Sequence, residues 1–344
     1  MRIALLAPLW KKVPPTKYGG TELVVANLAD GLVRLGQDVT VFACGGSKST
    51  AAIVEVIDRP LYDMMGGFRF DSVPYCDLAS LKIAFDAARD GRFDIINNHM
   101  NMSLAPFGSY CPVPMVSTNH SSVAPDNKQL SELSGQSMYI SISEAQRKLA
   151  PQLNYVATIY HGIQTDRFDY DTSPHGDYLL FLATMSREKG ADLAIEIAHR
   201  ANMRLIMAGN VTDRAFFESL KPQIDKDHVI FVGEVGHAEK NKLMREAYAY
   251  LLPIRWQEAF GLTMVESLAS GTPVIAFNKG AVPELIDNGK TGYIVSSVEQ
   301  AVEAVKKIPE ISRAECRHQA VTRFDVMRMA KDYLKLYHQL IACK

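Results

Sequence analysis

Two glutamates stand out as residues that could do chemistry. Glu258 and Glu266 belong to the segment E-A-F-G-L-T-M-V-E, which directly follows an apolar run typical of a buried strand. The pattern predicts a loop at the carboxyl end of that strand and a helix that begins near Thr263. Glu258 is then expected on the loop and Glu266 in the first turn of the helix. Ligands of parallel α/β sheets bind at this edge.

The predicted helix start has its own chemistry. The backbone N–H groups of residues 261–264 have no partner inside the helix and carry a partial positive charge, so they can hold an anionic phosphate. A carboxylate such as Glu266 can accept hydrogen bonds from a diol such as a ribose. An alternative stays open at this point, because Thr263 and Glu266 also have the spacing of a capping box.

The Glu258 segment and several other motifs together resemble the retaining glycosyltransferases of family 4. These enzymes have the GT-B fold of two facing, doubly wound Rossmann-like domains. The resemblance extends over nearly the whole chain. The matching motifs are Y-G-G-T-E at 18–22, F-D-I-I-N-N-H at 93–99, S-T-N-H at 117–120, S-I-S-E at 141–144, R-E-K-G at 187–190, E-A-F-G-L-T-M-V-E at 258–266 with G-T-P-V at 271–274, and P-E-L-I with two glycines at 283–292.

The resemblance implies that the second domain binds a nucleotide-diphosphate sugar. Glu266 would hold the ribose hydroxyls, and Lys189 would neutralise the diphosphate, with Arg187 nearby. The main chain at the helix start would contact the sugar and the diphosphate. The residues concerned there are Phe260, Gly261, Leu262 and Thr263.

Three further roles follow from the same resemblance. Glu258 would bind hydroxyls of the donor sugar near the reacting carbon, and His120 would reach that sugar from the first domain. Gly19 and Gly20 would let the backbone approach the phosphates closely, as residues without Cβ can. Glu258, His120 and Lys189 are therefore the expected catalytic residues.

The implied reaction moves a hexose to an acceptor hydroxyl with retention of configuration. Negative charge develops on the leaving diphosphate, and lysine, arginine and helix N-termini can stabilise it without a metal. The sequence shows no cluster of metal-ligand residues, and no cofactor is expected beyond the nucleotide sugar. UDP-glucose is the starting expectation for the donor. The sequence does not identify the acceptor, which is a saccharide, a lipid or a small molecule.

One departure from the family pattern concerns the diphosphate. The family has an arginine after the first strand of the second domain, and Thr184 stands in that place. Arg187 or Arg255 could supply the missing charge, or both could be ordinary surface residues. Ala259 also replaces a proline, for which a slightly looser loop is expected.

Apolar runs alternate with helical periodicity along the chain, which predicts two parallel-sheet α/β domains. We expect domains at 1–162 and 163–324, with a polar linker at 161–177. The C-terminal segment 325–344 is expected to contain a last helix, 325–342, that packs back on the first domain. The expected strands are 3–7, 39–43, 93–97, 115–118, 138–141, 156–159, 178–183, 204–208, 229–232, 249–253, 274–277 and 293–295.

Composition limits the possible partners and the compartment. The net charge of −1 argues against a nucleic-acid binder. Five widely spaced cysteines favour a reducing, cytoplasmic location over a disulfide framework. No run reaches the roughly 18 apolar residues of a membrane span, and the first residues indicate a strand, not a signal peptide. Contact with a membrane surface stays open.

Two other functions of the same fold remain as alternatives. One is a sugar-nucleotide epimerase, which would need acid and base groups around the sugar and no acceptor. The other is a non-catalytic sugar-nucleotide sensor, which the missing arginine at Thr184 favours. For His99 two roles remain: it is either a buried hydrogen-bonded residue or a ligand contact. His161 is expected in a structural turn.

Overall fold

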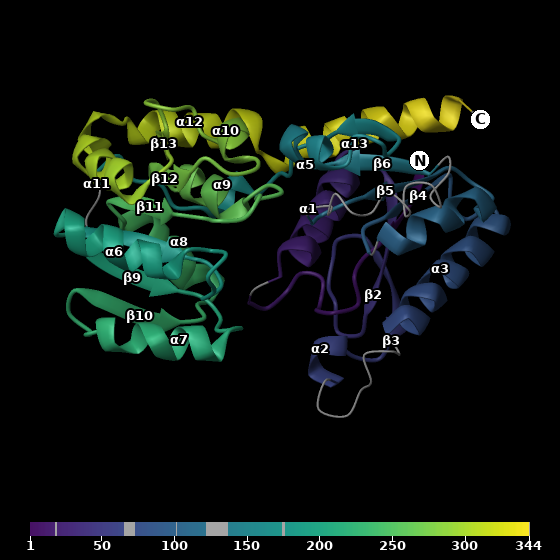
Figure 1. The fold of residues 1–344 in the computed structure, drawn as a ribbon. Coiled ribbons are helices and arrows are strands. Elements are labelled where there is room, and N and C mark those ends of the chain that lie inside the picture. The colour runs from purple at the N-terminus through teal and green to yellow at the C-terminus, as the bar shows by residue number, and fades with distance from the viewer. Residues whose placement is uncertain (18, 65–72, 101, 122–136, 174–175, 344) are drawn as a thin grey trace. The chain divides into compact units, whose positions relative to one another are not determined.

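The computed structural model describes the chain except residues 18, 65–72, 101, 122–136, 174–175 and 344, and it divides into two compact units (Figure 1). Unit 1 comprises Met1–Gly162 and Val326–Lys344, and unit 2 comprises Ile163–Asp325. Tyr18, the first residue of the glycine motif, lies outside the described residues.

Unit 1 is built on a seven-stranded parallel sheet with the order β3-β2-β1-β4-β5-β6-β7. The order reverses between β1 and β4, so helices cover both faces, as in a doubly wound fold. The strands are β1 (Arg2–Leu6), β2 (Asp38–Cys44), β3 (Ala52–Ile57), β4 (Ile95–Asn98), β5 (Met115–Thr118), β6 (Met138–Ser141) and β7 (Tyr155–Thr158); the helices between them are α1 (Gly20–Arg34), α2 (Leu61–Met64), α3 (Val73–Arg89), the 3₁₀ segment Met102–Tyr110 and α5 (Glu144–Leu149).

The C-terminal helix α13 (Val326–Ala342) completes unit 1, as expected, and packs against α1 (Figure 1). Gly31 of α1 allows this approach, because a Cβ there would lie 2.7 Å from Cβ of Ala330. Two buried tyrosines of α13 join the polar ends of the central strands. Tyr337 accepts a hydrogen bond from Asn97 (2.7 Å), and the Tyr333 hydroxyl lies 3.3 Å from that of Thr118.

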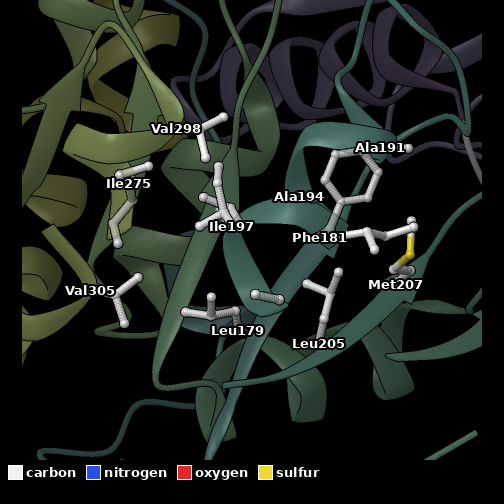
Figure 2. Packing of buried hydrophobic residues seen from close by; sticks show 14 of the residues in the cluster. Leu179, Phe181, Ala191, Ala194, Ile197, Leu205, Met207, Ile275, Val298 and Val305 are labelled. Carbon is white, nitrogen blue, oxygen red and sulfur yellow. The ribbon is translucent and has the colours of Figure 1, made fainter. Parts of the chain in front are cut away.

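Unit 2 is built on a six-stranded parallel sheet with the order β10-β9-β8-β11-β12-β13. Its core is an aliphatic cluster between the sheet and α6 and α11, which Figure 2 shows around Leu179, Phe181 and Ile197. The elements are β8 (Tyr178–Leu182), α6 (Ala191–Ala201), β9 (Arg204–Ala208), α7 (Arg214–Leu220), β10 (Val229–Gly233), α8 (His237–Glu246), β11 (Ala249–Leu252), α9 (Leu262–Ala269), β12 (Val274–Phe277), α10 (Val282–Leu285), β13 (Gly292–Val295), α11 (Val298–Lys307) and α12 (Arg313–Arg323), with 3₁₀ turns at Thr165–Arg167, Lys221–Gln223 and Ile308–Glu310.

Both parallel sheets confirm the expected fold class, but two local expectations were wrong. The segment 161–177 is not simply a linker, because from Ile163 onward it folds onto unit 2. Phe168 is buried, and Thr165 donates a hydrogen bond of 2.6 Å to Asp325. The strand β3 was not expected; it is a half-exposed edge strand without the continuous apolar run of the central strands.

Candidate active site

Glu258 lies where the sequence predicts it, on the loop between β11 and α9. The following loop, after β12, fixes the backbone of this residue. Ala281 donates its N–H to the carbonyl oxygen of Glu258 (2.8 Å). Gly280 has a positive φ of 57°, and a Cβ there would come 2.1 Å from the same oxygen. A side chain at 280 would therefore displace Glu258, and sequence reasoning did not single out this glycine.

Lys189 lies on the loop between β8 and α6, and this loop packs directly on the Glu258 loop. Gly190, which caps α6, has a left-handed conformation, and a Cβ there would lie 2.1 Å from the carbonyl oxygen of Pro253. The N–H of Arg255 donates to the carbonyl oxygen of Glu188 (2.8 Å). These backbone approaches bring Lys189 and Glu258 to one place.

The two charged side chains form a mostly buried ion pair. Nζ of Lys189 lies 2.7 Å from Oε2 of Glu258, and the two side chains are 21% and 11% exposed. Trp256 contacts both partners: its Nε1 donates to the same carboxylate oxygen (3.3 Å), and its ring lies 4.7 Å from Nζ of Lys189. The arrangement places one cation, one carboxylate and one aromatic face side by side at the carboxyl end of β11.

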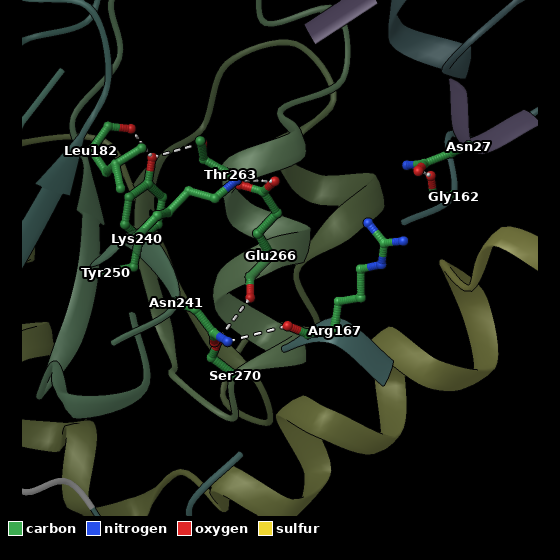
Figure 3. Close-up of polar contacts among 10 residues, drawn as sticks. All are labelled: Asn27, Gly162, Arg167, Leu182, Lys240, Asn241, Tyr250, Thr263, Glu266 and Ser270. Carbon is green, nitrogen blue, oxygen red and sulfur yellow. Dashed lines mark hydrogen bonds and ion pairs between the residues drawn. The ribbon is translucent and has the colours of Figure 1, made fainter. Parts of the chain in front are cut away.

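The start of α9 differs in detail from the expectation. The helix begins at Leu262 with Gly261 as its N-cap, in a left-handed conformation and without a side-chain cap. Thr263 is not the cap of a capping box, because its hydroxyl lies 2.8 Å from that of Tyr250 (Figure 3). The N–H of Met264 already bonds to the carbonyl oxygen of Gly261. The N–H groups nearest the tip, at 261–263, are therefore the ones suited to an anion.

Glu266 lies in the second turn of α9, one turn later than expected, and forms a second ion pair. Its carboxylate is 2.5 Å from Nζ of Lys240, on α8, and the two side chains are only 4% and 17% exposed. Figure 3 shows the lysine extending from its helix to the carboxylate. The Lys240 ammonium also lies 5.7 Å from the ring of Phe168. Sequence reasoning missed Lys240, which is 26 residues away and carries no motif.

The arginines considered as substitutes at the diphosphate make other contacts. Arg255 binds both carboxylate oxygens of Asp192 (2.6 and 2.8 Å) and the carbonyl oxygen of Arg187 (2.8 Å). The guanidinium of Arg187 lies over the ring of Phe216 at 4.8 Å. Thr184 donates to Oδ1 of Asn210 (2.9 Å). Arg255 thus fastens the loops of the site together.

The ring of Phe260 points into the core of unit 2. It is buried and packs edge to face on Phe324 with ring centroids 6.1 Å apart. Any contact of this residue with a ligand would therefore fall to its main chain. Leu262 and Thr263 are partly exposed beside it.

In unit 1, Gly19 and Gly20 form the turn into α1. A Cβ on Gly19 would lie 2.7 Å from Cβ of Pro15 and 3.2 Å from the Glu22 carboxylate, so the close packing of this turn requires glycine. Glu22 itself is buried, and burial raises the pKa of its carboxyl group.

His120 follows β5 and is one of three histidines in contact. Nε2 of His120 lies 2.9 Å from Nδ1 of His99, which follows β4. The ring of His161 stacks on the other side of His120, with centroids 5.1 Å apart and planes inclined by 18°. Burial lowers the pKa of His120 to about 3 and holds the pKa values of His99 and His161 well below the usual range. His161 is therefore more than the turn residue that was expected.

The described part of the chain lacks two features. Within it, no group of three or more His, Cys, Asp or Glu is arranged to hold a metal ion. No helix there is long and apolar enough to cross a membrane.

Comparisons with known proteins match both units. Residues 18–167 match the glycosyltransferase family 4 profile, and residues 162–323 match that of the glycosyl transferases group 1. An uncharacterised glycosyltransferase of Methanocaldococcus jannaschii is 26% identical, over 86% of this chain and 85% of its own. The O-antigen chain mannosyltransferase C of Escherichia coli is 24% identical, over 98% of each.

A solved structure shares the fold. The Anabaena protein HepE, in complex with UDP and glucose, superposes with a TM-score of 0.75 at 19% identity, over 99% of this chain and 100% of its own. The two profiles together span residues 18–323, and the sheets have the order and connections that the GT-B fold requires. The chain therefore belongs to the group 1 glycosyltransferases of family 4.

Proposed function

We propose that the chain transfers a hexose from a nucleotide-diphosphate sugar to an acceptor hydroxyl, with retention of configuration and without a metal. The Lys189–Glu258 pair carries this proposal, because it holds a cation and a carboxylate ready at the carboxyl end of β11. A diphosphate would compete with Glu258 for the ammonium of Lys189. The released carboxylate could then accept hydrogen bonds from the hydroxyls of the donor sugar.

The start of α9 supports the same assignment. The partly exposed N–H groups at its tip can share the charge of the leaving diphosphate with Lys189. Glu266, held by Lys240 in the second turn of α9, is the carboxylate for the ribose hydroxyls. In this mechanism the leaving phosphate takes the proton of the acceptor, which attacks from the same face.

The donor and the compartment follow by analogy. UDP-glucose is the first donor to test, since a protein of the same fold is known in complex with UDP and glucose. A reducing compartment such as the cytoplasm suits the five cysteines, which form no disulfide with one another. The acceptor is an unidentified saccharide, lipid or small molecule.

The experiment is a panel of UDP-, GDP- and ADP-sugars with the purified full chain, with and without EDTA. A sugar nucleotide at 100 times its dissociation constant stabilises a protein by about 2.7 kcal/mol, which a thermal melt detects easily. We expect one donor to stabilise the protein and to release its nucleotide slowly, equally with EDTA. No stabilisation by any donor, or release that needs a metal, would contradict the proposal.

A second candidate function, the non-catalytic sugar-nucleotide sensor, is favoured by Thr184. Neither Arg187 nor Arg255 brings its charge to Lys189, because Phe216 and Asp192 hold them. The variant Thr184→Arg decides between the two. A charge-assisted bond of roughly 1.5–3 kcal/mol corresponds to about a 10- to 100-fold gain in turnover for a transferase. A sensor would bind the donor and stay without turnover.

A further inference from the structure

Trp256 lies at the surface, although tryptophan has a large apolar ring. The structure leaves 41% of this residue exposed, on the loop between β11 and α9. Both of its neighbours in sequence are fastened to other segments. Arg255 binds the two carboxylate oxygens of Asp192 (2.6 and 2.8 Å), and the side chain of Gln257 accepts the N–H of Gly280 (2.8 Å). The backbone on either side of the ring is therefore held, and the exposure does not come from a loose loop.

The indole contacts both residues of the Lys189–Glu258 ion pair. Its Nε1–H donates to Oε2 of Glu258 at 3.3 Å. The Lys189 ammonium lies 4.7 Å from the ring centroid, within the range of a cation–π contact. The same ammonium lies 2.7 Å from Oε2. One carboxylate oxygen thus has two donors from two different residues, and all three residues belong to unit 2.

The two oxygens of the Glu258 carboxylate therefore differ. Oε2 has both donors, whereas Oε1 has no hydrogen-bond partner among the described residues. Nor is Oε1 one of the buried, unpartnered polar atoms of those residues, so it borders solvent. A carboxylate oxygen can accept hydrogen bonds from hydroxyl groups. Oε1 is thus the atom that a sugar hydroxyl can reach without breaking the contacts at Oε2.

The contact with Trp256 matters most when a diphosphate draws the Lys189 ammonium away from Glu258. The Glu258 side chain is only 11% exposed, so its carboxylate would be costly there without any donor. The indole N–H bonds to Oε2 independently of the lysine. It therefore leaves one charge-assisted hydrogen bond on the carboxylate, which opposes rotation of the side chain.

We propose that Trp256 is a positioning residue: its indole N–H keeps Oε2 of Glu258 in place while Lys189 binds the diphosphate, so that Oε1 stays directed at a hydroxyl of the donor sugar. This inference rests on the proposed function, in which Glu258 binds that sugar and Lys189 neutralises the diphosphate. The aromatic face has a separate part, since it keeps the ammonium beside the carboxylate before the donor binds.

NMR of the indole N–H tests whether the bond to Glu258 survives the loss of the lysine. The chain has two tryptophans, so in the variant W10F the indole signal comes from Trp256 alone. We expect its N–H to exchange slowly with water in W10F and in W10F/K189M, and quickly in W10F/E258Q, which lacks the charged acceptor. Exchange in W10F/K189M as fast as in W10F/E258Q would overturn the proposal.

Melting temperatures test the same point without any ligand. K189M and W256F each leave one donor on Oε2, whereas the double variant leaves none. The double variant should therefore melt lower than the sum of the two single shifts predicts, and this excess should vanish when Glu258 is replaced by Gln. The matched control is W10F, the same exchange in unit 1, whose shift should add to that of K189M. Simple additivity of K189M and W256F would contradict the shared role at Oε2.

Two variants of Trp256 connect the N–H to activity. W256F keeps an aromatic face for Lys189 and lacks the N–H. W256H restores an N–H, because Nε2 of imidazole occupies the same ring position as Nε1 of indole. We expect W256F to lose about 10-fold in kcat/KM for the donor. W256H, assayed at about pH 8 where imidazole is neutral, should recover most of that loss. A W256H enzyme as slow as W256F would show that the size of the indole matters and not its N–H.

The outcomes separate this inference from the function on which it rests. A protected indole N–H in W10F/K189M without any sugar transfer would leave the contact with Glu258 intact and contradict the proposed function. Sugar transfer that is equally fast in W256F and in the unaltered chain would contradict the role of Trp256 alone.

Discussion

The carboxyl ends of the two parallel sheets hold different kinds of side chain. Unit 1 presents neutral imidazoles, with burial holding the pKa of His120 at about 3. Unit 2 presents two ion pairs, Lys189–Glu258 and Lys240–Glu266, whose partners come from separate elements. The same architecture thus places buried neutral rings at this end of one sheet and ion pairs at this end of the other.

This difference fits what each unit would bind under the proposed function. A neutral N–H can hold a sugar hydroxyl without a change of charge on binding. A buried ion pair can exchange one partner for an anion such as a diphosphate, so that neither charge is ever left alone. Five predictions test or sharpen this contrast; one is described above at Thr184, and four follow.

The largest effect is expected at the most buried pair. Lys240→Met would leave the Glu266 carboxylate, which is 4% exposed, without its cation. Removing one partner of a buried pair costs about 3 kcal/mol or more, measurable as a lower melting temperature of the full chain. The double variant K240M/E266Q should recover most of that loss. If K240M alone melts like the unaltered chain, the pair is not a stabilising unit.

Activity should depend most on the other pair. Lys189→Met removes the cation for the leaving diphosphate, and we expect a loss of about 100-fold in kcat/KM for the donor. The matched control is Lys306→Met in the exposed Lys306–Glu303 pair on α11, which should leave the rate unchanged. A K189M enzyme with full activity would refute the role of Lys189.

Lowering the pH should destabilise unit 1 more than unit 2. The histidines have pKa values lowered by burial, so below pH 6.5 they bind protons only when unfolded, and stability falls as the pH falls. Each contributes up to about 1.4 kcal/mol per pH unit. Glu22 and Asp77 oppose this, because burial raises their pKa values, that of Asp77 to about 6. The test therefore compares the slope of the unfolding free energy against pH in H161N and in the unaltered chain. The slope of H161N should be smaller by the amount that corresponds to one proton.

Trp10 lies in unit 1 and Trp256 in unit 2, so the variants W256F and W10F let fluorescence follow each unit during urea unfolding. When the pH is lowered from 7.5 to 5.5, the urea midpoint reported by Trp10 should fall. The urea midpoint reported by Trp256 should stay the same. A shift confined to Trp256 would contradict the assignment of acid sensitivity to the histidines.

The smallest effect is expected at the half-exposed pair that fastens the loops. Arg255→Lys would lose the two-pronged bond to Asp192, whose side chain is 31% exposed against 39% for Arg255. Solvent screens such a pair, so we expect a loss of about 0.5–1 kcal/mol in unfolding free energy and only a small change in turnover. A large loss of donor binding in R255K would mean that Arg255 contacts the ligand.

The central strands could be predicted because their apolar runs are continuous; β5 (Met115–Thr118) and β12 (Val274–Phe277) match the expected bounds. The edge strand β3 could not, since all six of its residues are exposed or only partly buried. The position of Glu258 follows from its strand and loop. Three other features depend on segments distant in sequence, for which no local pattern exists. They are the contact of Gly280 with the Glu258 backbone, the pairing of Glu266 with Lys240, and the stacking of His161 on His120.

The helix α13 has a consequence for the order in which the protein can form during synthesis. Unit 2 is continuous in sequence and can fold once residue 325 has left the ribosome. Unit 1 is discontinuous, and Asn97 and Thr118 find their tyrosine partners only when residues 326–344 have also left the ribosome. Unit 1 can therefore be completed only after all of unit 2 has been synthesised, although most of unit 1 precedes unit 2 in the sequence.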